Sequence, residues 1–572
     1  MKRLMIMAGL AWLAASLSAC GGGSSGGLGS GASPSPPNTP TVSLVVTGAR
    51  VWTGDPGMPW AEAVAVAGDE IIGVGSAEDV APLIGEGTEV IAVDGGMLVP
   101  GFIDAHVHFL AGGSSIASVH LRDAQTPDEF VRRIEAFAAD AAPGEWITDG
   151  AWDHTNWGGE LPRRDWIDAV TPDNPVWVSR LDGHMALANS LALKQAGVDA
   201  DTPDVGGGEI VRDGEGRPTG ILKDNAMLLV QQAMPAPTER QLDAFLDAAM
   251  QYVAAQGVTT VHDMSDGIGD GWAGLETYRR AEARGDLVTR IYSVTPLGEW
   301  RKLADDIERN GHGSEWLKTG GVKGFMDGSL GSHTAAMLEP FTDTQDESGF
   351  LLDSLENLRT MMTGADAAGL QLNIHAIGDK AIRDLLDIFH EVAKENGERD
   401  RRFRMEHAQH IHPDDIARFA VQDVIASMQP YHAIDDGRWA EDVIGSERAL
   451  TTYAFESLID SGAHLALGSD WYVAPADPIA GIYAAVTRRT LDGRNPEGWV
   501  PEQKITVEQA LRGYTYEGAY ASFEEDRKGT IKVGMLADMV LIDRDLTAIP
   551  PETIRDAKVL KTIVGGRVVF SR

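Results

Sequence analysis

The chain has 572 residues, of which 43% are hydrophobic, and a formal net charge of −37 at pH 7. That length exceeds one ordinary domain and is typical of a large barrel with an accessory domain. So strong a negative charge argues against nucleic-acid binding and against adhesion to an anionic surface.

Residues 1–20 are predicted to be a lipoprotein signal peptide. Lys2 and Arg3 precede an apolar run that is too short for a good membrane span. The run ends in Leu17-Ser18-Ala19-Cys20, which resembles the bacterial lipobox. The resemblance implies that Cys20 is lipidated and anchors the protein in the cell envelope; a buried thiol is the alternative. Gly21 favours an outer-membrane location facing the periplasm if the cell is Gram-negative.

Cysteine content and the next segment bound the rest of the N-terminal region. Cys20 is the only cysteine, so no disulfide can form within the chain. Residues 21–40 are almost entirely Gly, Ser and Pro. That composition cannot bury a core, and it predicts a flexible tether.

Short β-rich runs are found near both ends of the remaining chain. Turn residues separate them, and neither group is long enough to form a stable unit alone. Residues 41–98 and 525–572 are therefore predicted to pair as one small β-sandwich. The runs are Ser43–Val46, Ala61–Val66, Glu70–Val74, Glu89–Val93, Asp538–Ile542, Val559–Val564 and Arg567–Phe570.

Residues 99–524 contain eight apolar runs that alternate with helical patterns such as Leu355–Ala368 and Lys380–Lys394. This alternation predicts an α/β fold, namely a parallel (β/α)₈ barrel of the TIM type. The expected strands are Gly101–His108, Thr259–Met264, Thr289–Val294, Val322–Ser329, Leu370–Ala376, Phe403–Ala408, Ile425–Pro430 and Leu465–Asp470.

Residues 109–257 are far too many for one loop after the first barrel strand. We predict an inserted cap subdomain over the mouth of the barrel, which contains the polar segment Asp182-Gly183-His184. The insert is also rich in tryptophan, which either contacts an apolar substrate or forms the core of the insert. These residues are Trp146, Trp152, Trp157, Trp166 and Trp177.

Metal-binding side chains recur on the expected barrel strands. Side chains at the carboxyl ends of such strands converge on the active site. His106 and His108 lie two residues apart, so they point to the same side of a strand and form a ready pair of metal ligands. The other candidates are Lys323 at the start of the fourth strand, His375 on the fifth, His407 after Glu406 on the sixth and Asp470 at the end of the eighth.

Seven motifs follow one another along the chain, and five of them contain these residues: Pro100–His108, Gly183–Ser190, Gly257–Asp263, Val322–Ser332, His375–Asp379, Glu406-His407 and Gly468–Asp470. The series resembles the amidohydrolase superfamily, and within it the amidohydrolase-3 or YtcJ-like family. The resemblance covers nearly the whole chain after the tether. It implies a barrel, a flanking β-sandwich and metal-dependent hydrolysis, usually of amide or related C–N bonds.

The chemistry of the residues agrees with that resemblance. Neutral imidazoles and carboxylates suit divalent zinc. His106, His108 and Asp470 are expected to hold one metal, and His375 and His407 a second. An ammonium group cannot bind a metal, but in the family pattern Lys323 matches a lysine that reacts with carbon dioxide and bridges both metals as a carbamate. An ordinary salt-bridged lysine is the alternative.

Two metals would lower the pKa of a bridging water, and one would polarise the substrate carbonyl. Asp470 is expected to take a proton from the attacking water and to return it to the departing nitrogen. The alternative for Asp470 is a plain ligand or a turn-capping residue.

Further polar and aromatic residues lie on the second strand, in the insert, or at and just beyond the expected strand ends. Each either contacts the substrate or has a local structural role. They are His184, His262, Asp327, Tyr431 and Trp471, together with His333 and His432.

The sequence thus predicts a metal-dependent amidohydrolase, acting on a small molecule and attached to the membrane only by its lipid anchor. Hydrolysis of an ester, a lactone or a cyclic imide at the same metals is an open alternative, because pocket shape sets the substrate. An inactive binding lipoprotein on the same scaffold is a second alternative. Oligomer formation is open.

Overall fold

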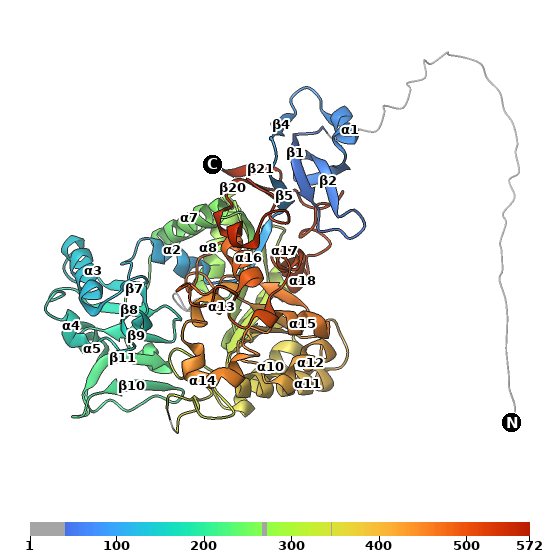
Figure 1. The fold of residues 1–572 in the computed structure, drawn as a ribbon. Helices are drawn as coiled ribbons and strands as arrows, with labels where there is room; N and C mark the ends of the chain where they lie inside the picture. The colour runs from blue at the N-terminus through green and yellow to red at the C-terminus, as the bar shows by residue number, and fades with distance from the viewer. Residues whose placement is uncertain (1–40, 266–270, 345) are drawn as a thin grey trace, which may run out of the picture. The chain divides into compact units, whose positions relative to one another are not determined.

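The computed structural model describes residues 41–265, 271–344 and 346–572 (Figure 1). The signal peptide, Cys20 and the tether therefore lie outside the described residues. Within the described residues the strands form three sheets, namely a barrel, a sheet built from both ends of the chain, and a sheet within the insert. No helix in the described ranges is long and apolar enough to cross a bilayer.

The central sheet confirms the predicted barrel. Its eight strands pair in parallel and in chain order. Backbone hydrogen bonds from Asp470 N to His106 O (2.7 Å) and from His108 N to Trp471 O (2.6 Å) join its first and last members. The strands are β6 (Phe102–Val107), β12 (Val258–Asp263), β13 (Arg290–Pro296), β14 (Leu317–Phe325), β15 (Gln371–Ala376), β16 (Arg404–His407), β17 (Ile425–Met428) and β18 (Leu465–Leu467).

The fourth strand differs from its predicted limits. β14 begins at Leu317, five residues before the expected Val322, and ends at Phe325. Gly320 and Gly321 interrupt its apolar pattern, and glycine is unfavourable in strands, so the pattern indicated too late a start. The correction places Lys323 near the carboxyl end of the strand, which is the end that faces an active site.

Amphipathic helices cover the barrel strands. In α11 the buried residues Ile382, Leu385, Phe389 and Val392 recur at helical spacing on one face. The helices around the barrel are α2 (Phe109–Ile116), α7 (Glu239–Ala255), α8 (Ala273–Arg284), α9 (Trp300–Asn310), α10 (Leu355–Ala367), α11 (Asp379–Asn396), α12 (Pro413–Val421), α13 (Pro430–Asp436), α14 (Ala440–Ala449), α15 (Phe455–Ser461), α16 (Pro478–Thr487), α17 (Val507–Gly513) and α18 (Tyr516–Ala521).

A second sheet joins the two ends of the chain, as predicted. The antiparallel pairing of β5 with β19 links them. All the strands belong to one continuous sheet, because β1 joins its parts. β1 carries a register shift between Thr47 and Val51; its residues before the shift pair with β4, and those after the shift pair with β5. The members are β1 (Leu44–Trp52), β2 (Trp60–Ala67), β3 (Glu70–Gly75), β4 (Glu89–Ala92), β5 (Met97–Pro100), β19 (Met539–Ile542), β20 (Val559–Val564) and β21 (Arg567–Ser571), with the short helix α1 (Ala77–Val80) beside them.

The third sheet lies within the insert, in the order β10-β11-β9-β8-β7. At the two ends of the insert, α2 and α7 pack against each other and against the barrel. The sheet and its small helices lie to one side of the barrel (Figure 1). They are β7 (Ile147–Trp152), β8 (Val176–Arg180), β9 (Met185–Ala188), β10 (Gly208–Arg212), β11 (Pro218–Asp224), α3 (Pro127–Asp140), α4 (Arg164–Ile167), α5 (Ser190–Ala196) and α6 (Leu228–Gln231).

Candidate active site

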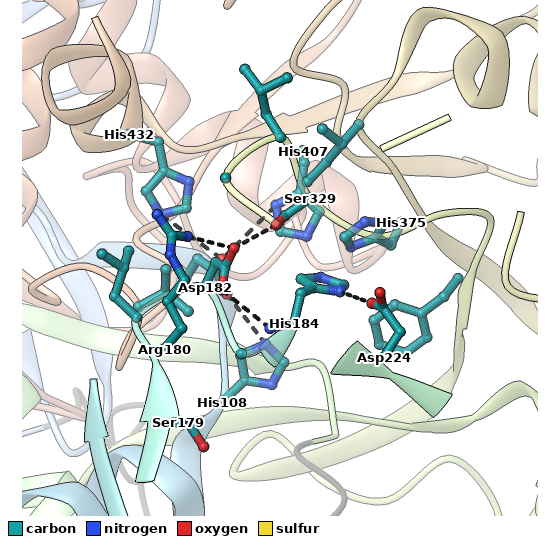
Figure 2. Close-up of a pocket in the computed structure, with 18 of the residues that line it drawn as sticks. His108, Ser179, Arg180, Asp182, His184, Asp224, Ser329, His375, His407 and His432 are labelled. Carbon is teal, nitrogen blue, oxygen red and sulfur yellow. Dashed lines mark hydrogen bonds and ion pairs between the residues drawn. The ribbon is translucent and has the colours of Figure 1, made fainter. Parts of the chain in front are cut away.

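A cavity of about 400 Å³ opens between the carboxyl ends of the barrel strands and the insert (Figure 2). The barrel contributes His108, Lys323, His375, His407 and Asp470 to its wall. His106 lies directly behind, fully buried. The structure therefore brings all six predicted metal-site residues to one end of the cavity.

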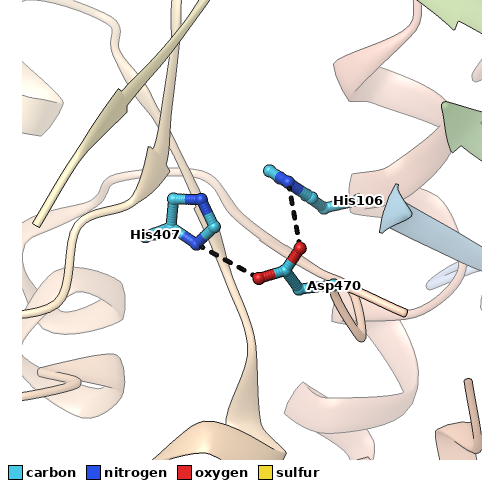
Figure 3. Close-up of side chains that lie close together, drawn as sticks. All are labelled: His106, His407 and Asp470. Atoms are coloured by element: carbon cyan, nitrogen blue, oxygen red, sulfur yellow. Dashed lines mark ion pairs between the residues drawn. The ribbon is translucent and has the colours of Figure 1, made fainter. Parts of the chain in front are cut away.

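Asp470 lies at the centre of this group. Its Oδ1 is 3.5 Å from His106 Nε2 and 3.2 Å from His108 Nε2, and its Oδ2 is 3.9 Å from His407 Nδ1. Figure 3 shows Asp470 between His106 and His407, and the three offer ligand atoms within 4.8 Å of one another. Such an arrangement fits a divalent cation.

Each candidate histidine ligand has one ring nitrogen against a protein oxygen that can only accept a hydrogen bond, so that nitrogen carries the proton. The other nitrogen is then free to bind a metal. The acceptors are Glu406 Oε2 for His106 (2.7 Å), Ser265 O for His108 (3.2 Å), Gly328 O for His375 (2.9 Å) and Gln429 Oε1 for His407 (3.0 Å).

The buried polar atoms provide a test of whether a metal fits. Asp470 Oδ1 is buried and has no hydrogen-bond donor, although it faces two imidazole nitrogens. An unpaired buried carboxylate oxygen is costly. A cation between it and the unprotonated nitrogens of His106 and His108 would satisfy all three groups, so the donor set fits zinc or a similar metal.

Electrostatics keep these groups in ligand form. Burial, followed by neighbouring positive groups, lowers the pKa of His106, His375 and His407 well below the ordinary value. Burial raises the pKa of Asp470, but His106 and His108 together lower it by more, so the pKa of Asp470 lies below its usual range. Neutral imidazoles therefore surround an ionised carboxylate.

Local backbone features bring the first and last strands together. A Cβ atom at Gly468 would lie 2.6 Å from the backbone nitrogen of His106, so only glycine permits this approach. The buried Asp104 Oδ1 accepts hydrogen bonds from Ser469 N (2.8 Å) and His106 N (3.3 Å). Asp470 adopts a φ of 60°, which is uncommon for a residue other than glycine.

Lys323 lies beside the candidate metal ligands. Its Nζ is 3.3 Å from His106 Nε2 and 4.9 Å from the centre of the Phe325 ring. Burial lowers the pKa of Lys323 to about 8.

Behind the metal-site residues lies a buried ion pair. Arg404 Nε is 2.9 Å from Glu406 Oε1, and both side chains are fully buried. Arg404 also donates to His262 Nδ1 (2.8 Å). Glu406 thereby holds His106 in one orientation and is itself held by Arg404. Sequence analysis noted Glu406 only as the neighbour of His407.

Among the predicted substrate contacts, His184 lines the cavity. Its Nδ1 is 2.7 Å from Asp224 Oδ1, and its ring centre is 5.1 Å from that of His375 (Figure 2). Burial lowers the pKa of His184, but Asp224 and Asp182 together raise it above the ordinary value. His432 also lines the cavity, with its Nε2 3.9 Å from Asp470 Oδ2 and without a hydrogen-bond partner.

The other predicted substrate contacts lie away from the cavity wall. His262 is buried against Arg404. Trp471 stacks on Tyr252 at 4.8 Å between ring centres, and Tyr431 packs on the hydrophobic core. His333 pairs with Asp343 at 2.9 Å. Some residues near strand ends face the cavity and others face the surrounding helices. A position near a strand end does not by itself tell which side a residue faces.

Asp327 also lies behind the cavity and supports the loop around it. It is fully buried and accepts hydrogen bonds from the backbone nitrogens of Ala336 (2.8 Å), Ile377 (3.0 Å) and Gly378 (2.8 Å). Burial raises its pKa to about 7. These contacts give Asp327 a structural role, and its Oδ1 also lies 3.6 Å from His375 Nε2.

The five tryptophans of the insert belong to its own packing. Trp152 and Trp177 are buried, and the other three pack against the insert's hydrophobic clusters. None of the five lines the cavity. The apolar part of the cavity lining comes instead from other residues, including Leu228, Phe325, Leu352, Trp439 and Tyr472.

A chain of ion pairs along the cavity wall, which we name the arginine–aspartate network, is not apparent from the sequence. Acidic and basic side chains alternate in it. Apart from the Arg180–Asp182 and Asp435–Arg438 pairs, no local spacing indicates these contacts. In order, the members are Asp182, Arg180, Asp153, Arg438, Asp435 and Arg122.

Comparison with known proteins gives consistent similarities. A model of the amidohydrolase family matches residues 89–570. Protein LONG AFTER FAR-RED 3 of Arabidopsis thaliana is 40% identical over 545 residues, which cover 94% of this chain and 93% of that protein. N-substituted formamide deformylase of Arthrobacter pascens is 30% identical over 557 residues, which cover 92% and 98%.

A solved structure is similar over most of the chain. It is the crystal structure of an uncharacterized metal-dependent hydrolase from Pyrococcus horikoshii, with a TM-score of 0.71 and 26% sequence identity. The match covers 89% of this chain and 99% of that one.

Proposed function

The chain belongs to the amidohydrolase family, and we propose that it hydrolyses amide-type C–N bonds other than peptide bonds. Family membership and the similarity to a metal-dependent hydrolase make it a metal-dependent hydrolase. The similarity to N-substituted formamide deformylase supports the finer proposal of an amide-type bond.

One observation carries the proposal. The buried carboxylate of Asp470 has an oxygen without a hydrogen-bond donor and lies against the Nε2 atoms of His106 and His108. This arrangement is suited to hold a divalent metal. Bound there, such a metal would supply Lewis acidity, which polarises a carbonyl and lowers the pKa of water.

The side chains of the site have distinct roles in this proposal. Oδ1 of Asp470 is assigned as the ligand oxygen. The other oxygen, Oδ2, takes a proton from the attacking water and returns it to the departing nitrogen. His432 Nε2 lies 3.9 Å from Oδ2, so an imidazole stands beside the oxygen that carries the proton.

We further propose that Lys323 is carbamylated and bridges two zinc ions, with His375 and His407 as ligands of the second. The observation in favour is position, because Lys323 Nζ lies 3.3 Å from His106 Nε2, and the ring centres of His375 and His407 are 4.5 Å apart. A carbamate there would supply an anionic group between the two sets of imidazoles.

The test measures metal content and hydrolysis in the purified protein. We expect bound zinc and turnover of N-acyl amides, lost after chelation, restored by zinc and lost in Asp470→Asn. A matched panel of esters, lactones and cyclic imides runs beside the amides. Turnover of these alone would move the function to that alternative. Absence of both metal and turnover would favour an inactive binding protein.

Lipid attachment is a separate proposal, which rests on the Leu17–Cys20 motif. Cys20 would anchor the protein in the cell envelope, in the outer membrane facing the periplasm if the cell is Gram-negative. Labelling with radioactive palmitate followed by membrane fractionation tests it. Cys20→Ser is expected to lose the label and to leave the membrane fraction, and an unchanged distribution would contradict the anchor.

A further inference from the structure

Five of the six members of the arginine–aspartate network line the cavity, and the sixth, Arg122, pairs with Asp435 behind the lining. Asp182 pairs with Arg180 at 2.6 Å, and Arg180 pairs with Asp153 at 3.4 Å. Asp153 pairs with Arg438 at 3.4 Å. Arg438 contacts Asp435, which pairs with Arg122 at 3.1 Å. Three arginines and three aspartates alternate, so their formal charges cancel.

The two arginines that line the cavity have little capacity left for a ligand. Each of the three guanidinium nitrogens of Arg180 meets an acceptor: Nε donates to His154 Nδ1 (3.3 Å), and the others bind Asp182 and Asp153. A Cβ atom at Gly331 would lie 2.5 Å from Arg180 Nη1, so Gly331 covers the guanidinium. Figure 2 shows Arg180 directed at Asp182.

Arg438 is engaged in the same way. Its Nη1 donates to Asn156 Oδ1 (3.2 Å), its Nε donates to the backbone oxygen of Asp435 (2.8 Å), and its Nη2 contacts Asp435 and Asp153. A substrate carboxylate is usually recognised by an arginine with a free pair of donors. Neither arginine that lines this cavity offers one.

The rest of the wall also disfavours an anion. Beyond the network, three aspartates (Asp224, Asp436 and Asp470) line the cavity against one lysine, Lys323, which belongs to the candidate metal site. The whole chain has a net charge of −37, which repels anions at long range. A carboxylate entering the cavity would therefore lose its hydration without gaining a cationic partner on this wall.

Apolar side chains cover another part of the wall, next to the metal-site residues. Phe325 is 38% exposed and Leu228 is 49% exposed, although most large apolar residues of the chain are buried. Leu352 connects them: its backbone nitrogen donates to Met326 O (2.9 Å), and its backbone oxygen accepts from Asn225 Nδ2 (3.1 Å). The barrel and the insert thus both contribute apolar side chains to the lining, and the Phe325 ring centre lies 4.9 Å from Lys323 Nζ.

We propose that the cavity selects uncharged amides with an apolar substituent and discriminates against substrates that carry a carboxylate. This inference rests on the proposed function, since it names the substrate class of the same site. The apolar substituent lies against Phe325, Leu352 and Leu228. The arginine–aspartate network supplies a polar but neutral wall, which fixes the shape of the cavity without attracting an anion.

Two probes that differ by one carboxylate test this class. N-acetyl-2-phenylethylamine is neutral, and N-acetylphenylalanine, used as both enantiomers, adds the carboxylate. We expect kcat/KM of the zinc-loaded protein to favour the neutral amide on the order of 100-fold, because an unpaired buried charge is costly. Equal or better turnover of the acid would overturn the inference and leave the proposed function standing.

Binding separates failure of the inference from failure of the proposed function. Calorimetry on zinc-loaded Asp470→Asn measures affinity for both probes without turnover. Preference for the neutral amide, together with no hydrolysis by the unaltered protein, would support the inference and contradict the proposed function. Weaker or equal binding of the neutral amide, including no binding, would overturn the inference.

Two pairs of variants test which residues cause the preference for the neutral amide. Leu228→Ser is expected to weaken binding of the neutral probe about tenfold, as for loss of an apolar pocket contact. Leu491→Ser is the control, because Leu491 is also 49% exposed and lies outside the cavity lining. Equal effects of the two would overturn the apolar contact.

The second pair tests the network. Asp182→Asn leaves Arg180 with less negative charge around it and is expected to narrow the discrimination against the acid about tenfold. Asp168→Asn is the control, because it removes a carboxylate of the insert that is bonded to Ser190 and lies outside both the network and the cavity lining. Equal narrowing by both variants would overturn the role of the network.

Discussion

The candidate metal site and the arginine–aspartate network differ in how completely their charged groups are paired. On the barrel wall, Asp470 Oδ1 is buried without a hydrogen-bond donor and faces unprotonated imidazole nitrogens. In the arginine–aspartate network, the guanidinium nitrogens of Arg180 and Arg438 already have acceptors. The difference indicates where a reaction can occur. The unpaired carboxylate oxygen on the barrel is suited to bind a cation, whereas the fully paired side chains of the network fix the shape of the cavity and carry no net charge.

Backbone geometry follows the same division. His407 and Asp470 on the barrel wall have φ values of 74° and 60°. Arg180 ends the regular strand β8, and Asp153 has extended backbone as the N-cap of a short helix. Uncommon backbone conformations at functional residues are a recurrent way of aiming side chains.

Among the variants, Asp470→Asn is expected to reduce activity most strongly. It removes the ionised oxygen that we assign to proton transfer, so kcat/KM should fall about 10³- to 10⁴-fold. Steady-state kinetics with circular dichroism checks this. Asp460→Asn, an exposed position, is the control, and full activity of Asp470→Asn would contradict the assignment.

Lys323→Ala should cost less, on the order of 10²- to 10³-fold in kcat/KM, because one metal contributes several kcal/mol of charge stabilisation. Zinc per protein, measured by mass spectrometry, should fall from two to one, and short carboxylic acids should restore part of the activity. Lys394→Ala, on an exposed helix face, is the control. Normal zinc content in Lys323→Ala would refute the bridging carbamate.

Glu406→Gln tests whether support behind the ligands matters. Glu406 accepts from His106 Nδ1 at 2.7 Å. Loss of such a partner typically costs about 10- to 100-fold in metal affinity. Competition with a chelator measures the zinc dissociation constant, with Glu398→Gln at an exposed position as control. Unchanged affinity in Glu406→Gln would show that His106 is oriented without it.

Asp153→Asn addresses the network and should affect stability more than chemistry. The buried carboxylate lies 3.4 Å from both Arg180 and Arg438. Its loss weakens two buried pairs, for which we expect about 2 kcal/mol of destabilisation in urea unfolding. Asp173→Asn, which is exposed, should stay within about 0.5 kcal/mol. Equal stability of the two variants would indicate that the network pairs contribute no net stability.

Much of the barrel side could be predicted from the sequence. His106 and His108 follow from the two-residue period of a strand, and the other candidate ligands lie at or near the carboxyl ends of parallel strands. Lys323 was placed at the start of its strand because Gly320 and Gly321 hid the first residues of β14. The substrate contacts were harder: His184 lines the cavity, whereas Trp471 packs against Tyr252.

By itself the sequence determined the barrel, the union of the two chain ends and the order of the candidate metal-binding residues, since these follow from local periodicity and from the parallel arrangement of strands. Only the tertiary structure decided which side chains form the arginine–aspartate network. Asp153 and Arg438 meet across 285 positions of sequence, and no local pattern encodes such a contact. Whether a buried charge is paired or left open for a metal depends on neighbours that folding alone brings into place.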